Sequence, residues 1–149
     1  MKALIQRVGK ANVSVGGKSI GTIDRGLLIF IGIYSNDSID DTYKVCKKII
    51  NLRIFNDSNK KLNKSVLDIG GEILLVSQFT LCADTQRGNR PSFNNAMGPK
   101  EAINLFNHLR DELSKFISVK IGKFGEMMEV SLINDGPVTI ILDTKNEDK

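Results

Sequence analysis

The strongest constraint on this fold is the run Leu27-Leu28-Ile29-Phe30-Ile31, which is apolar at every position and lies between Gly26 and Gly32. A strand with one face in water alternates apolar and polar residues. An unbroken apolar run of this length is therefore typical of a strand that is covered on both faces. The segment Ile73-Leu74-Leu75-Val76 has the same character. We therefore expect both segments to lie at the centre of a sheet.

Several other segments have the composition of short strands, whereas only two have helical spacing. Strands are predicted at 3–15, 19–23, 72–81, 119–121, 128–133 and 138–142, with Gly16-Gly17 as a turn. A helix is predicted from Ile39 to Ile50 after the cap Asp37-Ser38. A second helix is predicted to begin at Pro99, with an apolar stripe that runs from Ala102 to Phe116.

The connecting segments complete the predicted architecture. Residues 56–71 are polar and punctuated by glycine, which predicts a long loop with one short helical turn, and residues 83–97 predict a basic loop. Because strands outnumber helices and do not alternate regularly with them, the predicted fold class is α+β with mixed or mainly antiparallel sheets and two main helices. The length of 149 residues is typical of a single compact domain, 1–149, and residues 144–149 are predicted to be a polar tail.

Composition narrows the location and the chemistry of the chain. No apolar run approaches the ~20 residues that span a bilayer, and Lys2 and Arg7 interrupt any signal-peptide core, so we expect a cytoplasmic protein with no membrane partner. Cys46 and Cys82 form no Cys-x-x-Cys pair and His108 is the single histidine, so a typical zinc site lacks its ligands. A net charge of +4 permits an anionic partner without requiring one.

A polar cluster, Ser77-Gln78-Phe79-Thr80, ends the second apolar run. Strand alternation predicts Gln78 and Thr80 on one face and Ser77 and Phe79 on the other. The cluster is either a strand end that emerges into solvent or a functional site, since buried polar groups are costly unless they are hydrogen-bonded. A Ser or Thr nucleophile needs a base, and the helical position of His108 places it toward solvent or the edge of the apolar stripe. A Ser-His-Asp hydrolase is therefore not expected.

Two further segments are candidates for binding. In Asn134-Asp135-Gly136-Pro137-Val138-Thr139, the Asp-Gly pair is typical of an ordinary hairpin turn, but Gly136 and Pro137 also leave two carbonyls open to close approach by a ligand. The stretch from Gln86 to Phe93 carries Arg87 and Arg90 in a loop with glycine and proline. Such arginines either grip phosphate bidentately or lie in a solvated loop.

Taken together, these segments resemble the D-aminoacyl-tRNA deacylase family, also called D-tyrosyl-tRNA deacylase, in one register from Met1 to about Asp143. The motifs that carry the resemblance are Gln6-Arg7-Val8, Gly26-Leu27-Leu28, Leu52-Arg53-Ile54-Phe55, Ser77-Gln78-Phe79-Thr80-Leu81, Arg90-Pro91-Ser92-Phe93, Phe124-Gly125 and Asn134-Asp135-Gly136-Pro137-Val138-Thr139. Ser-Gln-x-Thr and Asn-x-Gly-Pro-x-Thr are highly specific as a pair. One departure is Glu126, where the family usually has alanine.

The resemblance implies a homodimeric enzyme that hydrolyses the ester between a D-amino acid and the terminal adenosine of tRNA, without metal or organic cofactor. It implies chiral proofreading in translation, with L-aminoacyl substrates rejected and glycyl-tRNA accepted, in an active site at the subunit interface. Gly136-Pro137 would be cis and would reach into the partner's pocket, where its carbonyls read the substrate's amino group, and Arg7 would hold that pair. Phe124 and Met128 match residues around the adenine pocket.

The resemblance offers two accounts of the chemistry, both within Ser77, Gln78, Phe79 and Thr80. In one, Thr80 attacks the ester. In the other, backbone N–H groups around Gln78 and Phe79 form an oxyanion hole while the adenosine's 2′-hydroxyl assists water, and the missing base favours this account. Two other hypotheses stay open: a non-catalytic tRNA-binding module that uses Arg87 and Arg90, and a small-ester hydrolase with Ser77 as nucleophile. A DNA partner is not expected.

Overall fold

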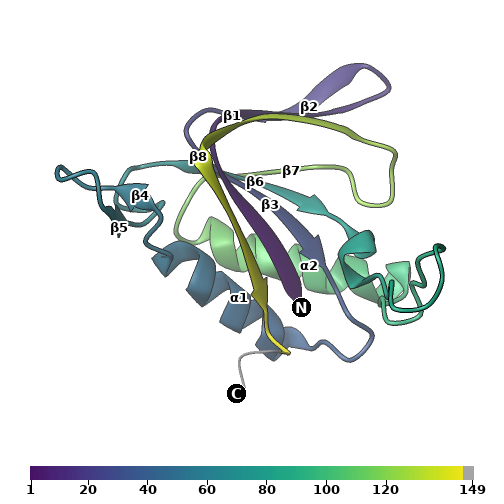
Figure 1. Ribbon diagram of the computed structural model, residues 1–149. Helices are drawn as coiled ribbons and strands as arrows, with labels where there is room; N and C mark the ends of the chain where they lie inside the picture. The colour runs from purple at the N-terminus through teal and green to yellow at the C-terminus, as the bar shows by residue number, and fades with distance from the viewer. Residues whose placement is uncertain (146–149) are drawn as a thin grey trace.

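The computed structural model describes residues 1–145, and its elements form an α+β fold with one large mixed sheet and two long helices (Figure 1). The strands are β1 (Lys2–Val15), β2 (Lys18–Ile23), β3 (Gly26–Gly32), β4 (Phe55–Asn56), β5 (Leu62–Lys64), β6 (Glu72–Ser77), β7 (Val119–Ile121) and β8 (Glu129–Asp143). The helices are α1 (Ile39–Asn51) and α2 (Pro99–Ser114), and η1 (Phe79–Cys82) is a 3-10 helix. The predicted fold class is confirmed.

Strand β1 organises the large sheet, whose order is β2-β1-β3-β6-β7. β3 pairs with the first half of β1 and β2 with its second half, whereas β8 pairs with β1 from Lys2 to Ser14. β6 is parallel to both β3 and β7, and the other pairs are antiparallel. The two apolar runs form β3 and β6, adjacent strands at the centre, as predicted.

Both faces of these central strands are buried, which explains their unbroken apolar sequence. Ile29 and Leu75 face a core shared with α1 and α2, and Figure 1 shows both helices on this side of the sheet. Leu28 and Leu74 face a second, smaller core that is closed by the far halves of β1 and β8. At ~25 cal/mol per Å² of apolar surface removed from water, these two cores provide most of the driving force for folding.

The helices begin where capping signals predict. Ser38 caps α1, and its backbone N–H donates to the Asp41 carboxylate at 2.9 Å in a capping box. Pro99 occupies the first turn of α2 after the cap residue Gly98. The predicted stripe of α2 is buried at Phe106 and its neighbours, but Phe116 lies beyond the helix and is exposed.

Three predicted segments differ in the structure. β6 ends at Ser77 rather than at Leu81, because the chain turns into η1 and Phe79 leaves the sheet. Residues 56–71 contain the β4–β5 hairpin, so the prediction of a loop without strands is wrong there. The strands predicted at 128–133 and 138–142 form one strand, β8, because both segments pair with the same partner, β1.

Thr144, the first residue of the predicted polar tail, packs against the rest of the fold. Thr144 is buried, its hydroxyl donates to Asp41 Oδ1 at 2.7 Å, and its N–H donates to the Met1 carbonyl at 3.0 Å. The rest of the predicted tail, 146–149, lies outside the described residues. Among the helices from residue 1 to residue 145, none is long and apolar enough to cross a membrane.

Candidate active site

A pocket of about 540 Å³ opens at the carboxyl ends of the parallel strands β3 and β6, where ligands commonly bind in sheets of this kind. Its lining includes five of the predicted site residues: Ser77, Gln78, Phe79, Phe124 and Met128. The other walls are mainly apolar and come from β3, the start of α2 and the turn before β8: Ile31, Ile33, Val76, Met97, Pro99, Ala102, Gly125, Glu126, Met127 and Val130. The contribution of the α2 N-terminus was not predicted from the sequence.

The backbone N–H groups of residues 78–80 follow the end of β6, where Gln78 and Phe79 line the pocket. The Gln78 N–H is already occupied, since it donates to the Ile31 carbonyl at 2.7 Å. Phe79 and Thr80 are the first residues of η1, and the first N–H groups of a helix have no partner within it. The N–H groups left for an oxyanion are therefore those of Phe79, which lines the pocket, and of Thr80, which is exposed and is not among the lining residues.

Gly32 is a further residue that positions the site, and the sequence analysis did not single it out. A Cβ on Gly32 would lie 2.8 Å from Leu81 Cβ and 3.2 Å from the Gln78 carbonyl oxygen. Only glycine therefore lets β3 and η1 approach this closely, and this contact fixes the turn that carries the donors. In the sequence, the one sign of this role is that Gly32 directly follows the apolar run Leu27–Ile31.

Among the described residues, no base is hydrogen-bonded to Ser77 or Thr80, and the carboxylate that lines the pocket, Glu126, lies on the opposite wall and pairs with Lys123. Gln78 Nε2 donates to Thr80 Oγ1, and an amide cannot accept the hydroxyl proton. His108 lies at the contact of α1 and α2, where its Nδ1 is 2.7 Å from Thr42 Oγ1, so its interpretation as a structural histidine is supported. Burial raises the pKa of Cys46 and Cys82 to about 11, so both thiols are protonated at neutral pH.

The opposite wall is the turn 122–128. Phe124 packs against Phe106 of α2, with ring centroids 5.8 Å apart. Met128 Sδ accepts the Lys123 N–H at 3.3 Å, and a Cβ on Gly122 would approach that sulfur to 2.7 Å. The turn therefore holds an aromatic ring and a thioether toward the pocket, which suits a flat apolar ligand such as a nucleobase. Glu126 lines the same wall and pairs with Lys123 at 3.2 Å.

Gly136 and Pro137 form a bulge within β8 rather than a hairpin turn. Gln6 pairs with Thr139 and Val8 pairs with Asn134, so four residues of β8 stand opposite Arg7. The peptide bond between Gly136 and Pro137 is cis, and both residues are exposed.

Three side chains brace this bulge. The buried Arg7 donates through Nε to the Asp135 carbonyl at 2.9 Å and through Nη1 to the Ile54 carbonyl at 2.8 Å. Asn134 Oδ1 accepts the Val138 N–H at 3.0 Å, and Asn134 Nδ2 donates to Thr139 Oγ1 at 2.9 Å. Asn134 and Thr139 belong to the motif that the sequence singled out, although no role was assigned to them there.

The bulge and the pocket do not meet within one chain. Ser77 is in register with Ile31, and Ile31 with Ala3, which is four residues before Arg7 on β1. At ~3.3 Å per residue and ~4.8 Å per strand, a flat sheet would place Arg7 about 13 Å from Ser77 along the strands and the bulged part of β8 about 14 Å across them. None of residues 134–139 lines the pocket, although Val130, at the other end of β8, does. Arg7, Gly136 and Pro137 are therefore separate from the other predicted site residues in the monomer.

The two predicted tRNA-binding arginines lie on the loop between η1 and α2. Asp84 and Ser92 exchange backbone hydrogen bonds of 2.8 and 2.9 Å, which close the base of the loop, while Arg87 and Arg90 are exposed beyond it. Figure 1 shows this loop projecting from the end of the molecule opposite the β4–β5 hairpin. Among the described residues, no group of three or more His, Cys, Asp or Glu side chains is arranged to hold a metal ion.

Comparison with known proteins identifies the family to which the chain belongs. The family model described as D-Tyr-tRNA(Tyr) deacylase matches residues 4–143. A D-aminoacyl-tRNA deacylase of Thermodesulfovibrio yellowstonii is 54% identical over 146 residues, which cover 97% of this chain and 100% of that protein.

Two solved structures share the fold. The one described as c-Myc DNA Unwinding Element Binding Protein has a TM-score of 0.92 and 43% identity, and covers 97% of this chain and 99% of its own. A probable eukaryotic D-amino acid tRNA deacylase has a TM-score of 0.81 and 15% identity, with coverage of 95% and 97%, and supports the fold alone. The chain belongs to the D-Tyr-tRNA(Tyr) deacylase family and is an enzyme of that class.

Proposed function

We propose that this enzyme hydrolyses the ester bond of D-aminoacyl-tRNA, releasing the free D-amino acid and tRNA. The observation that carries the proposal is the pocket itself, which is lined by Phe79, the first residue of η1, and by a wall that contains Phe124 and Met128. The N–H groups at the start of η1 are assigned as its donors. The wall accepts the terminal adenine and the donors receive the ester carbonyl. The release of D- and L-amino acids from charged tRNA tests this function directly.

The reaction that fits these groups uses no protein nucleophile. Water attacks the ester carbon, and the oxyanion that forms accepts hydrogen bonds from the N–H groups of Phe79 and Thr80. A preorganised donor of this kind contributes about 2.7–4 kcal/mol to the transition state. The ester C–O bond then breaks, and the proton lost by water is delivered, with help from the neighbouring 2′-hydroxyl, to the departing ribose oxygen. Ser77 and Gln78 shape the floor of the site.

Selection for the D-configuration is assigned to Gly136-Pro137. Its carbonyls would accept hydrogen bonds from the substrate's amino group, and an L-amino acid would clash with them at the α-carbon. Because selection acts at the α-carbon, the side chain stays free and achiral glycine, as glycyl-tRNA, is accepted. This device rejects the wrong substrate by steric conflict rather than by a side-chain pocket.

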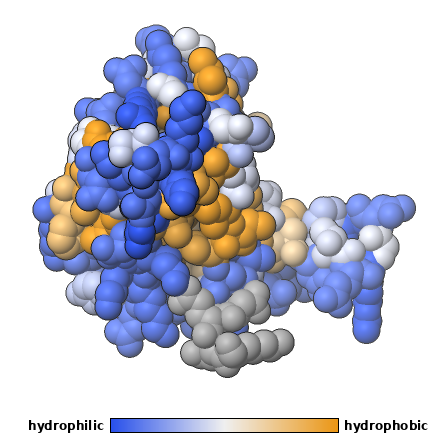
Figure 2. Space-filling model, turned by 60° about the vertical axis from the view of Figure 1, so that its left-hand side comes forward, coloured by the Kyte–Doolittle hydropathy of each residue, from blue (hydrophilic) through white to orange (hydrophobic). Residues whose placement is uncertain are grey.

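The separation of the bulge from the pocket supports a homodimer whose active site is shared between subunits. Ile133 and Ile141 of β8 are 66% and 62% exposed, and Leu4 pairs with both Phe30 and Ile141 on the same face of the sheet. Figure 2 shows apolar surface spread across the middle of one face of the molecule. An open apolar sheet face of this kind suits a second copy, which would bring its Gly136-Pro137 to the pocket.

We expect Thr80→Ala to reduce kcat by less than about 100-fold, because Thr80 orients Gln78 and the side chain bonded to its hydroxyl is an amide, which cannot activate a nucleophile. Thr80→Val, which keeps the shape without the hydroxyl, is expected to behave similarly in single-turnover deacylation. Loss of all turnover in both variants, with Thr80→Ser active and an acyl-enzyme visible by mass spectrometry, would instead establish a Thr80 nucleophile.

Binding to tRNA is expected to weaken as salt rises, and Arg87→Ala or Arg90→Ala to flatten that dependence. Each phosphate contact contributes about 0.7–0.9 to the slope of log affinity against log salt, so each variant should lose about that amount. Lys61→Ala, on the β4–β5 hairpin, is the matched control and should keep the full slope. Unchanged slopes in both arginine variants would place the RNA contact elsewhere. Efficient competition by duplex DNA would contradict the expectation that DNA is not a partner.

The alternative of a non-catalytic tRNA-binding module predicts binding without release of an amino acid. The geometry favours the enzyme, because a binding module needs no pocket with unpaired backbone donors. A serine hydrolase with Ser77 as nucleophile is disfavoured by the same lack of a base that applies to Thr80. Independence from metal and a cytoplasmic location stay predictions.

A further inference from the structure

Two aromatic side chains are exposed together at the mouth of the pocket. Phe79 is 58% exposed and Phe93 is 37% exposed, and their rings meet edge to face with centroids 5.1 Å apart and planes at 69°. Phe79 also lines the pocket, as does Met127, which is 90% exposed. Single exposed apolar residues are ordinary, but a cluster of them beside a pocket marks a surface that something covers.

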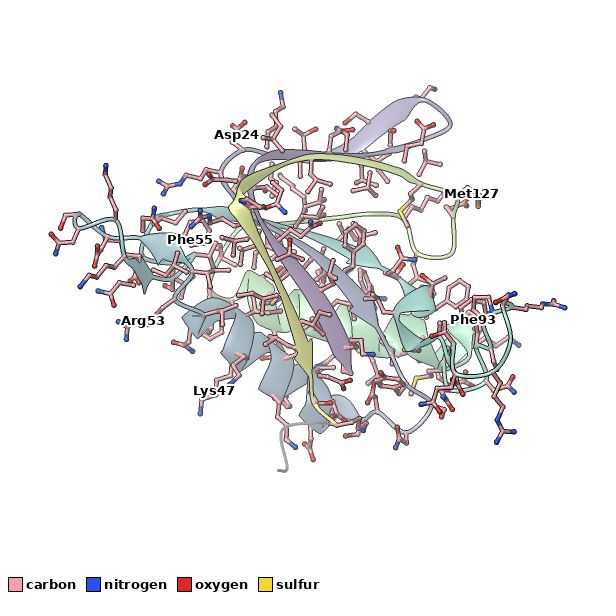
Figure 3. All side chains as sticks on the ribbon, viewed as in Figure 1. Asp24, Lys47, Arg53, Phe55, Phe93 and Met127 are labelled. Atoms are coloured by element: carbon pink, nitrogen blue, oxygen red, sulfur yellow. The ribbon has the colours of Figure 1, made fainter. Side chains whose placement is uncertain are left out.

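The loop that carries Phe93 is anchored close to the aromatic pair. Asp84 and Ser92 are bonded through their backbones, and the Met97 N–H donates to the Ile33 carbonyl at 2.9 Å. The Ala96 N–H donates to the Phe93 carbonyl at 2.9 Å, which closes a turn directly after the ring. Backbone hydrogen bonds therefore hold the segment that carries the Phe93 ring. Figure 3 shows Phe93 and Met127 at the same end of the molecule.

Charge indicates what covers this surface. The loop beyond Ser92 and Asp84 carries Arg87 and Arg90, both exposed, so the aromatic pair adjoins a cationic segment. Exposed rings next to guanidinium groups are the combination that binds single-stranded nucleic acid, in which bases stack on the rings and phosphates pair with the cations. An apolar protein surface would cover the two exposed guanidinium groups without offering them counter-charges, whereas an RNA strand offers bases to the rings and phosphates to the arginines.

We propose that Phe93, together with Phe79, is a stacking platform for the unpaired nucleotides that precede the terminal adenosine of tRNA. The proposal rests on the proposed function, in which the pocket receives that adenosine. The nucleotide before it emerges at the mouth of the pocket, where the rings lie, and the strand then continues along the loop with Arg87 and Arg90. Phe93 thereby acts in binding of the RNA strand and not in the chemistry.

The test compares a long and a short substrate. Phe93→Ala is expected to lower kcat/KM for D-aminoacyl-tRNA by roughly tenfold, mainly through KM, because each base that stacks on an aromatic ring contributes at about this level. For a D-aminoacyl-adenosine ester, which lacks the preceding nucleotides, kcat/KM is expected to change less than about twofold. Phe93→Trp should retain activity on tRNA, and Phe93→Leu, apolar but without a ring, should resemble Phe93→Ala.

Three outcomes would overturn the proposal. An equal loss on both substrates would make Phe93 a wall of the pocket, and no loss on either would leave the ring without a role in binding. Conversion of Phe93→Ala to a monomer in sedimentation, with the wild type dimeric, would mean that a second copy covers the ring. If the wild type hydrolyses neither ester, the proposed function fails, while roughly tenfold weaker binding of a short single-stranded RNA by Phe93→Ala still supports the platform.

Discussion

Gly136→Ala is expected to lower turnover of D-aminoacyl-tRNA by at least about 100-fold while the protein stays folded. Gly136 has a φ of +132°, where residues with a side chain are strained, and a Cβ there would lie 2.8 Å from Arg7 Nη2 and 2.9 Å from Val138 Cγ2. The chain must therefore shift at the bulge. A displacement of about 1 Å at a positioning group costs on the order of 100-fold in rate.

The control for this variant is Gly9→Ala, on β1, the strand that pairs with β8, where a side chain would enter open space. No atom lies within 4 Å of a Cβ on Gly9, and its φ is not in the positive range, so both activity and melting temperature should be unchanged. Mixing Gly136→Ala with a pocket variant, Phe124→Ala, should restore activity, because in a mixed dimer one intact pocket receives one intact bulge. Full activity of Gly136→Ala alone would exclude the assigned role of the bulge.

Arg7→Ala is expected to destabilise the protein by about 2–3 kcal/mol, as well as to reduce activity to the level of Gly136→Ala. Arg7 is buried, and its loss leaves the carbonyls of Asp135 and Ile54 without their charged donor. For a domain of this size the melting temperature should fall by roughly 6–10 °C. Arg7→Lys should rescue little, since one ammonium cannot reproduce the two fixed directions of a guanidinium.

The matched variant is Arg110→Ala on the half-exposed side of α2, whose guanidinium donates to the neighbouring side chains Asp111 and Asn107. Its melting temperature and activity should match the wild type, because exposed ion pairs contribute little. A fully active Arg7→Ala with an unchanged melting temperature would show that the bulge holds its shape without the guanidinium.

The parts of the fold that could be predicted are those that depend on residues close together in the sequence. The unbroken apolar run at Leu27–Ile31 required burial on both faces, and it forms a central strand. Ser38 and Pro99 mark helix starts through capping and fixed φ, which depend on a few neighbouring residues only. The family motifs were found because their residues lie close together in the sequence.

The parts that could not be predicted depend on distant partners. β6 stops at Ser77 because Gly32, on another strand, admits η1 against β3, and no residue near Ser77 encodes that contact. Asp135-Gly136 has the local signature of a hairpin turn, but β8 continues through it because β1 is long enough to pair with both halves. The Phe79–Phe93 contact joins residues that are separated by the loop, so periodicity gave no sign of it.

The central claim is tested most directly by charging one tRNA with D- and with L-tyrosine in parallel and measuring release of the free amino acid by the wild-type enzyme. We predict rapid release of the D-isomer, while the L-isomer leaves at the rate of the enzyme-free control. The same preference should persist with EDTA, once magnesium bound to the tRNA is controlled for. Equal release of both isomers would contradict chiral selection by Gly136-Pro137, and no release of the D-isomer would contradict the proposed function itself.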